Sequence, residues 1–255
     1  MIGVVTGDGE VMNMVHKVLV TGSSTGFGDA IARQFIGRGV KLVGLSRSGG
    51  GLEDLRSDPN VTLYSGDVTD RALAAELLAR HRPDTVILNA GVIGDVAPIT
   101  HQTWESFTAT WETDVKATLV WCQEAVRLPL EGATIVVMSS GAAIGGSPLT
   151  GGYGGAKRTQ WIMANHFQEE CNRIGIQIRF VTVFPRITGD TKLSRDAAQA
   201  YGARANLTAE EWLSGLGQPF NASSLARSVY TLLEASPVLG ANAYAINGEG
   251  FRIMP

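Results

Sequence analysis

A tyrosine and a lysine stand four residues apart in the stretch Tyr153-Gly-Gly-Ala-Lys157, and Ser140 precedes the tyrosine by thirteen residues. The residues after Tyr153 have helical spacing, and residues i and i+4 of a helix share one face. A phenol and an ammonium group would therefore point into the same space, where the positive charge favours the phenolate form. Such a phenol can act as a general acid or base, and the hydroxyl of Ser140 could hold a substrate oxygen against it.

The same spacing has a second interpretation, in which an exposed lysine stands beside a tyrosine that packs in the interior. Random placement of the five tyrosines and five lysines would produce about 0.1 such pairs in a chain of this length. The pair is suggestive by itself, and other motifs have to decide between packing and chemistry.

A second motif, TGSSTGFG, occupies residues 21–28. The apolar run 17–21 leads into it and the helical pattern 29–36 follows it, so the glycines stand between a buried strand and a helix. Glycine lets the backbone approach a pyrophosphate closely, and the N-terminus of the following helix favours the anion. The motif predicts a dinucleotide-binding loop with these candidate residues: Gly22, Ser24, Thr25, Gly26, Phe27 and Gly28.

These motifs, in this order, resemble the short-chain dehydrogenase/reductase family from about Lys17 to the C-terminus. The resemblance implies that Ser140, Tyr153 and Lys157 are catalytic. It also implies that Tyr153 and Lys157 contact the cofactor, with Lys157 on the nicotinamide ribose. Further cofactor contacts follow the third, fourth and sixth strands of the family's pattern: Asp67, Val68, Asn89, Ala90, Gly91, Pro185 and Thr191.

Two residues depart from the family's pattern. Asp114 stands where the family usually has an asparagine whose backbone carbonyl helps hold a water for the catalytic lysine, and it joins the catalytic candidates. A carboxylate there would change the charge near Lys157 and alter the proton relay. Arg186 replaces the usual glycine after Pro185, and we expect its side chain to point to solvent, with an anionic substrate group as the alternative partner.

The end of the second predicted strand, Ser46-Arg47, bears on the choice of cofactor. Dinucleotide folds that prefer NAD place a carboxylate here for the ribose hydroxyls, whereas an arginine can accommodate the 2′-phosphate of NADP. No acid stands at Ser46, and a guanidinium suits phosphate because it offers paired donors. We therefore expect NADP as the cofactor, with NAD as the alternative; in the structural interpretation Arg47 is only a solvated loop cation.

The elements that position these residues alternate along the chain. We predict strands near 17–21, 41–45, 61–64, 85–88, 133–139, 176–183 and 242–246. We predict helices near 27–37, 70–81, 104–127, 153–174 and 222–235. Such alternation implies parallel strands joined by right-handed crossovers. The expected fold class is therefore α/β: a single-domain, Rossmann-like, doubly wound parallel sheet of about seven strands with helices on both faces.

The domain organisation expected from this pattern is simple. Residues 1–16 form an irregular N-terminal arm, and residues 17–255 form the dinucleotide-binding domain. Within that domain, 187–220 is predicted to be long and irregular, and long loops after the carboxyl ends of strands often cover a ligand. Because this region covers the substrate in the family, its aromatic residues are expected to line an apolar pocket, to pack the loop down, or both.

Composition and charge exclude several classes of protein. The chain has 255 residues, a net charge of −3 and a pI near 5.8. This composition gives no indication of a basic surface that would bind nucleic acid or an anionic membrane. No apolar run approaches the ~20 residues of a membrane span, and the N-terminus lacks the features of a signal peptide. Cys122 and Cys171 are expected to be reduced and packed, which suits a cytoplasmic protein. The four histidines lack metal-site spacing, so no metal is expected.

The chemistry that these residues predict is a reversible redox reaction between a carbonyl and an alcohol of a small-molecule substrate. A hydride passes between NADP(H) and the substrate carbon, Tyr153 moves the proton of the oxygen, and Ser140 polarises that oxygen. One alternative is nucleotide-sugar epimerase or dehydratase chemistry, although such relatives usually carry a larger C-terminal domain. The other is a non-enzymatic NADP-sensing regulator, which loss of the catalytic tyrosine would favour.

The helices near 104–127 and 153–174 carry more apolar residues than one sheet-facing stripe needs. These residues are Trp104, Phe107, Trp111, Trp121, Trp161, Ile162 and Phe167. In relatives the two helices pair across a two-fold axis, so the resemblance predicts a homotetramer, with a homodimer as the alternative.

Overall fold

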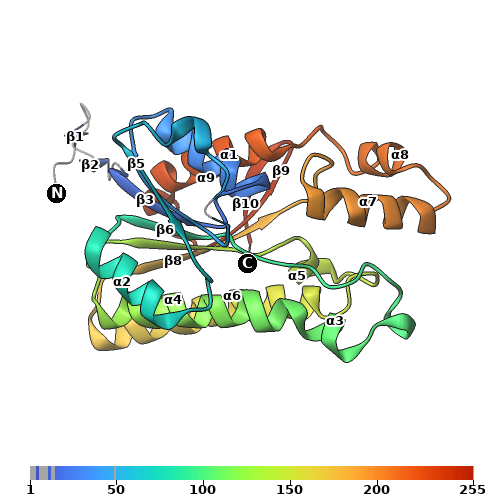
Figure 1. Cartoon of the computed structure of the whole chain (residues 1–255), viewed down its shortest axis with the longest axis horizontal. Helices are drawn as coiled ribbons and strands as arrows, with labels where there is room; N and C mark the ends of the chain where they lie inside the picture. Colours follow the sequence, from blue (N-terminus) through green and yellow to red (C-terminus); the bar gives the residue numbers. More distant parts are fainter. Residues whose placement is uncertain (1–3, 6–10, 13–14, 49, 255) are drawn as a thin grey trace.

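A mostly parallel sheet forms the centre of the molecule in the computed structural model, which describes residues 4–5, 11–12, 15–48 and 50–254. Eight strands of this part of the chain pair in the order β10-β9-β8-β7-β6-β3-β4-β5, and all neighbours run parallel except β9 and β10 (Figure 1). The strands are β3 (Lys17–Thr21), β4 (Lys41–Ser46), β5 (Val61–Ser65), β6 (Thr85–Leu88), β7 (Thr134–Met138), β8 (Arg179–Pro185), β9 (Ala243–Asn247) and β10 (Gly250–Ile253).

The sheet has one strand more than the seven that the sequence predicts. The additional strand is β10, which pairs antiparallel with β9 at the edge of the sheet. It has only four residues, and none of them is buried, so it lacks the apolar run by which the other strands are recognised. The prediction of a single-domain, doubly wound α/β fold is confirmed.

Helices cover both faces of this sheet (Figure 1). Their bounds are α1 (Gly26–Ile36), α2 (Arg71–His81), α3 (Trp104–Thr110), α4 (Lys116–Arg127), α5 (Ala142–Gly145), α6 (Tyr153–Ile174), α7 (Lys192–Arg204), α8 (Ala209–Ser214) and α9 (Ala222–Leu239), with the short turns η1 (Glu53–Leu55), η2 (Ile99–His101) and η3 (Trp111–Val115). Alternate residues of one strand enter different cores: Val18 packs with α1 and α9, whereas Leu19 packs with α2, α4 and α6. Burial on both faces explains the continuous apolar strands.

The helical run predicted over 104–127 is interrupted by η3, a π-helical turn between α3 and α4. A π turn inserts one extra residue per turn, so it shifts the faces of the helix on either side, and such turns are frequent at functional sites. The shift turns Asp114 inward, where its side chain is fully buried. Sequence periodicity alone does not reveal this turn, because α3 and α4 are each amphipathic.

The prediction of an irregular segment over 187–220 is wrong, because α7 and α8 lie within it. Thr191 caps α7 by accepting a hydrogen bond from the amide of Ser194. Thr208 and Glu211 form a reciprocal capping box at the start of α8. A threonine followed three residues later by glutamate indicates the start of a helix, so the beginning of α8 is predictable from the sequence.

Only some of the apolar residues of α3, η3, α4 and α6 lie at the surface. Trp121 is buried in the core and donates its indole N–H to the carbonyl of Val68 at 2.8 Å, and Phe167 packs on Phe180. Trp121 therefore belongs to the fold, and its assignment to a subunit interface is wrong, whereas Phe167 is only partly buried. Trp104 remains 72% exposed and Trp111 37% exposed.

The N-terminal segment contributes a separate feature where an irregular arm was expected. Val4–Val5 (β1) and Val11–Met12 (β2) pair antiparallel in a two-stranded sheet. No helix in the described part of the chain is both long enough and apolar enough to cross a membrane. The same residues contain no group of three or more histidine, cysteine or acidic side chains that could hold a metal ion.

Candidate active site

A large pocket opens at the carboxyl ends of the parallel strands. The strands β4 and β5 add to one side of β3, whereas β6 adds to the other, so the sheet has a topological switch point between β3 and β6. Open α/β sheets bind ligands in the crevice at such a point. The pocket there has a volume of about 1720 Å³, which exceeds the ~300–1,000 Å³ of a pocket for one drug-sized ligand. It has room for a dinucleotide together with a substrate.

The glycine loop between β3 and α1 forms one wall of this pocket. Gly22 has a φ of +68°, and a Cβ atom there would lie 2.8 Å from the Cα of Ala90. A Cβ atom on Gly28 would lie 2.1 Å from the carbonyl oxygen of Gly22. The N-cap residue of α1, Thr25, makes no side-chain capping bond, so the first amides of the helix stay available to an anion. These features fit a pyrophosphate group.

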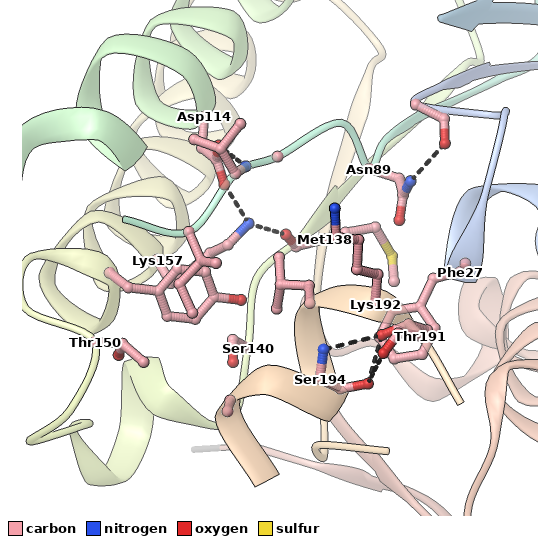
Figure 2. A pocket seen from close by; sticks show the side chains of 18 of the residues that line it. Phe27, Asn89, Asp114, Met138, Ser140, Thr150, Lys157, Thr191, Lys192 and Ser194 are labelled. Carbon is pink, nitrogen blue, oxygen red and sulfur yellow. Dashed lines mark hydrogen bonds and ion pairs between the residues drawn. The ribbon is translucent and has the colours of Figure 1, made fainter. Parts of the chain in front are cut away.

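Asn89 ties the glycine loop to the end of β6. Its amide and that of Ala90 donate to the hydroxyl of Thr21 at 3.0 and 3.1 Å. The Asn89 side chain donates to the carbonyls of Thr21 and Gly22 at 3.2 and 3.3 Å, and Figure 2 shows its amide directed at the loop. Asn89, Ala90 and Gly91 line the pocket, as the sequence predicts, and Asn89 also fixes the loop.

Ser46, Arg47, Asp67 and Val68 lie together at the β4–β5 end of the pocket. Ser46 is buried and donates to the carbonyl of Gly50 at 3.3 Å, whereas Arg47 is exposed. The Asp67 carboxylate accepts the amide of Thr69 at 2.7 Å, and this backbone hydrogen bond lowers the pKa of Asp67. An exposed guanidinium and a fixed carboxylate therefore face the same space.

Three of the four predicted catalytic side chains, Ser140, Tyr153 and Lys157, line the opposite end of the same pocket. Ser140 follows β7, and its hydroxyl accepts the amide of Ala142 at 3.2 Å. Tyr153 is the first residue of α6, and Lys157 follows one turn later. The ammonium of Lys157 is buried, donates to the carbonyl of Met138 at 3.0 Å and lies 5.6 Å from the centroid of the Tyr153 ring.

Asp114 reaches this end of the pocket from η3. Its Oδ2 lies 2.8 Å from the Nζ of Lys157, and its Oδ1 accepts the amide of Val92 at 2.9 Å (Figure 2). Burial raises the pKa of Asp114, although the nearby ammonium opposes that change. Burial alone would lower the pKa of Lys157, but the charge and hydrogen bonding of Asp114 and the charge of Tyr153 together outweigh burial and raise that pKa above its ordinary value. We take the pair to be ionised at neutral pH, because each charge is the other's partner in a buried site.

The expectation that Arg186 points to solvent is wrong. Its guanidinium donates to the carbonyl of Leu216 and, at 2.5 Å, to that of Gln218, and it lies over the ring of Phe220. Its Nε is buried without a hydrogen-bond partner. Arg186 therefore ties the end of β8 to the segment between α8 and α9. Sequence analysis missed this tether because the carbonyls lie thirty residues away.

Thr191 and Pro185 line the pocket beside the glycine loop. Gly26 has a φ of +61°, and a Cβ atom there would lie 3.3 Å from a methyl carbon of Thr191. The α7 helix therefore begins against the loop between β3 and α1.

Residues 16–202 match the family described as short chain dehydrogenase, and this match includes both the glycine loop and the catalytic end of the pocket. The chain belongs to that family.

As a short-chain dehydrogenase, the protein is an NAD(P)-dependent oxidoreductase that acts on CH–OH groups. The Escherichia coli protein named NADP-dependent 3-hydroxy acid dehydrogenase YdfG is 28% identical over 233 residues, which cover 82% of this chain and 92% of that protein.

Solved structures show the same fold. The crystal structure of levodione reductase has a TM-score of 0.77 and 21% identity, and the match covers 91% of this chain and 96% of that one. The closed form of serine dehydrogenase complexed with NADP+ has a TM-score of 0.68 and 23% identity, with coverage of 85% and 88%.

Ser147 and Thr150 of this short-chain dehydrogenase site were not predicted from the sequence, whereas Tyr201 and Trp212 are among the aromatic residues of 187–220 that were. The hydroxyls of Ser147 and Tyr201 lie 2.5 Å apart, Thr150 donates to Ser147, and the Tyr201 ring stacks on Trp212 at 5.2 Å. These contacts join the α5–α6 loop to α7 and α8 across the pocket. No local motif signals such a contact, because its partners stand more than fifty residues apart in the chain.

Proposed function

We propose that this short-chain dehydrogenase catalyses the reversible, NADP(H)-dependent reduction of a carbonyl group to an alcohol on a small molecule. One observation carries the proposal: Ser140, Tyr153 and Lys157 line the same pocket as the glycine loop at Gly22 and Gly26. A redox reaction needs the proton-transfer group and the cofactor site in one enclosed space, because proton and hydride reach the same carbonyl.

The side chains of the pocket have the following roles in this proposal. In carbonyl reduction the phenol of Tyr153 donates its proton to the substrate oxygen, and in alcohol oxidation the phenolate takes that proton back. The ammonium of Lys157 stabilises the phenolate by its charge, and the Ser140 hydroxyl donates a hydrogen bond to the substrate oxygen. The nicotinamide cofactor supplies or accepts the hydride when it is bound.

The preference for NADP(H) is supported by the residues at the β4–β5 end of the pocket. Arg47 is exposed there, and Ser46 stands where NAD enzymes place an acid. The Asp67 carboxylate is held by the turn at Thr69. The Escherichia coli relative is NADP-dependent by its name, which agrees with this assignment.

The substrate in this proposal is a small molecule with an apolar body. Apolar side chains from several elements line the pocket: Ile93, Val96, Ile187, Leu193, Trp212 and Leu216. The α7 and α8 helices lie beyond the end of the sheet (Figure 1), and residues of both helices line the pocket. The polar groups at the reacting end would fix the carbonyl, and the apolar lining would bind the rest of the molecule.

The test is steady-state consumption of NADPH with a panel of ketones, aldehydes and oxo acids, followed by the loss of nicotinamide absorbance. We expect turnover with at least one member of the panel and formation of one alcohol for each NADPH consumed. A protein that binds NADPH but consumes none with any carbonyl, and reduces no NADP+ with any alcohol, would contradict the proposal and favour a cofactor-sensing role.

A further inference from the structure

We propose that Asp114 is a positioning residue of the proton relay, whose carboxylate holds the ammonium of Lys157 directly. The inference rests on the proposed function, since it concerns how the lysine is kept beside the tyrosine. Residues of four elements meet at this point: η3, α6, the loop after β6 and the end of β7 (Figure 2). In the family's pattern a backbone carbonyl and a water serve the lysine, and this chain departs from that arrangement.

The contact between the two side chains is direct and buried. Asp114 Oδ2 lies 2.8 Å from Lys157 Nζ, and the two side chains are 0% and 6% exposed. The loop after β6 closes over the carboxylate, since a Cβ atom on Gly91 would lie 2.6 Å from Asp114 Oδ2. The amide of Val92 binds the other oxygen at 2.9 Å. The carboxylate is therefore fixed on two sides.

The backbone carbonyl of Asp114 has other partners. It accepts the hydroxyl of Thr118 at 2.9 Å and the side-chain amide of Gln160 at 3.2 Å. The same Gln160 nitrogen also donates to the hydroxyl of Thr118 at 2.6 Å. A carbonyl oxygen has two lone pairs, so two protein donors occupy it fully. The carbonyl that holds a water in the family's pattern is saturated here, and the carboxylate takes over the contact with the lysine.

The ammonium of Lys157 is left with a defined orientation. One of its three N–H groups donates to the carbonyl of Met138 at 3.0 Å, and the ammonium forms an ion pair with Asp114 Oδ2, which has no hydrogen-bond partner of its own. No other acceptor for the ammonium lies among the described residues, and Tyr153 lines the pocket on the same helix face. Two anchors on separate elements keep a flexible side chain from rotating, so the remaining N–H stays directed at the pocket.

Few other charges face this pair. Tyr153 is the other titratable group that α6 directs at it, and the described residues from Asn89 to Gly94 and the end of β7 contribute none. Glu112 and Lys116, on the same helical run as Asp114, are exposed. Burial raises the pKa of Asp114, so its carboxylate takes up a proton at higher pH than an ordinary carboxyl group. Protonation there would release the ammonium, so acid should slow turnover while the fold persists.

The experiment compares Asp114→Asn with wild type and with Glu112→Gln. The control removes a carboxylate from the same turn, at an exposed residue that also lines the pocket but forms no ion pair with Lys157. We expect kcat for carbonyl reduction to fall about 10- to 100-fold in Asp114→Asn, since a misplaced catalytic group commonly costs that much. The KM for NADPH should change far less. In wild type we expect kcat to decrease as the pH falls. This decrease should disappear in Asp114→Asn and persist in Glu112→Gln.

A second measurement needs no turnover. The NMR signal of the Lys157 ¹³Cε, assigned by its absence in Lys157→Arg, reports the protonation of the ammonium. The ammonium should lose its proton at lower pH in Asp114→Asn than in wild type, because the carboxylate that stabilises the positive charge is gone. If Asp114→Asn does not fold, the pH dependence of wild-type kcat still tests the proposal. A decrease of kcat at low pH in folded wild-type protein supports the positioning role of Asp114, and the absence of such a decrease overturns it. An Asp114→Asn variant with the kcat, pH profile and lysine titration of wild type would also overturn the role. A wild type without any turnover would overturn the proposed function itself.

Discussion

Replacement of Arg47 by aspartate should reverse the cofactor preference of the enzyme. The guanidinium is exposed at the β4–β5 end of the pocket, beside the buried Ser46 and the fixed carboxylate of Asp67. Aspartate at this position would repel a 2′-phosphate and could accept hydrogen bonds from the ribose hydroxyls of NAD. The expected result is a lower kcat/KM with NADPH and a higher one with NADH.

The size of the effect follows from the exposure of Arg47. A hydrogen bond to a charged group contributes about 1.5–3 kcal/mol when shielded, and solvent reduces that contribution at the surface. A value of about 1–2 kcal/mol corresponds to a 5- to 30-fold loss with NADPH. The new carboxylate should also repel the 2′-phosphate of NADPH and bind the ribose hydroxyls of NADH. Together these effects should change the ratio of kcat/KM with NADPH to kcat/KM with NADH by a factor on the order of 100.

The assay measures kcat/KM with both cofactors at low and high ionic strength. Arg227→Asp is the matched control, because Arg227 is exposed on α9 and does not line the pocket. We expect the NADPH preference of wild type to weaken as salt screens the phosphate contact. Equal efficiency of wild type with NADPH and NADH, or an Arg47→Asp variant that behaves like Arg227→Asp, would refute the reasoning.

Four further outcomes test other parts of the structure. Lys157→Ala should lower the free energy of unfolding by about 3–5 kcal/mol in denaturant titrations, because Asp114 would be left buried without its partner, and adding Asp114→Asn should restore part of that loss. Trp121→Ala should cost about 3–5 kcal/mol by the same measurement, since it empties a core site. Arg186→Gly should speed amide hydrogen exchange in 214–220 without a comparable change in β3–β7, because it removes the tether to that segment. Light scattering should report a homotetramer, or a homodimer, that exposed Trp104 helps to form, and a monomer would contradict this assignment.

The sequence was sufficient to predict the parallel part of the sheet, because each of these strands is an apolar run bounded by polar or glycine residues. The glycine loop, Ser140, Tyr153 and Lys157 were also recognisable, since they are local motifs with fixed spacing. The structure brings all of them to one pocket. Topology explains this, because the carboxyl ends of parallel strands meet at one edge of the sheet.

Features that depend on distant partners could not be predicted in this way. The tether from Arg186 to the segment before α9 and the contact of Tyr201 with Ser147 join residues far apart in the chain. The π turn that buries Asp114 leaves the amphipathic pattern on either side unchanged. Trp121 was placed at an interface because helical spacing shows that a residue is apolar but not which surface it packs against.

The most direct test of the proposed chemistry is turnover of Tyr153→Phe. This variant removes the proposed proton donor and keeps the aromatic ring, while the glycine loop that would hold the pyrophosphate is unchanged. Loss of a positioned general acid typically lowers the rate by about 10²–10⁴-fold, so kcat should fall by that factor and the dissociation constant for NADPH should stay close to that of wild type. Turnover of Tyr153→Phe at the wild-type rate would contradict the assignment of Tyr153 as the proton-transfer group.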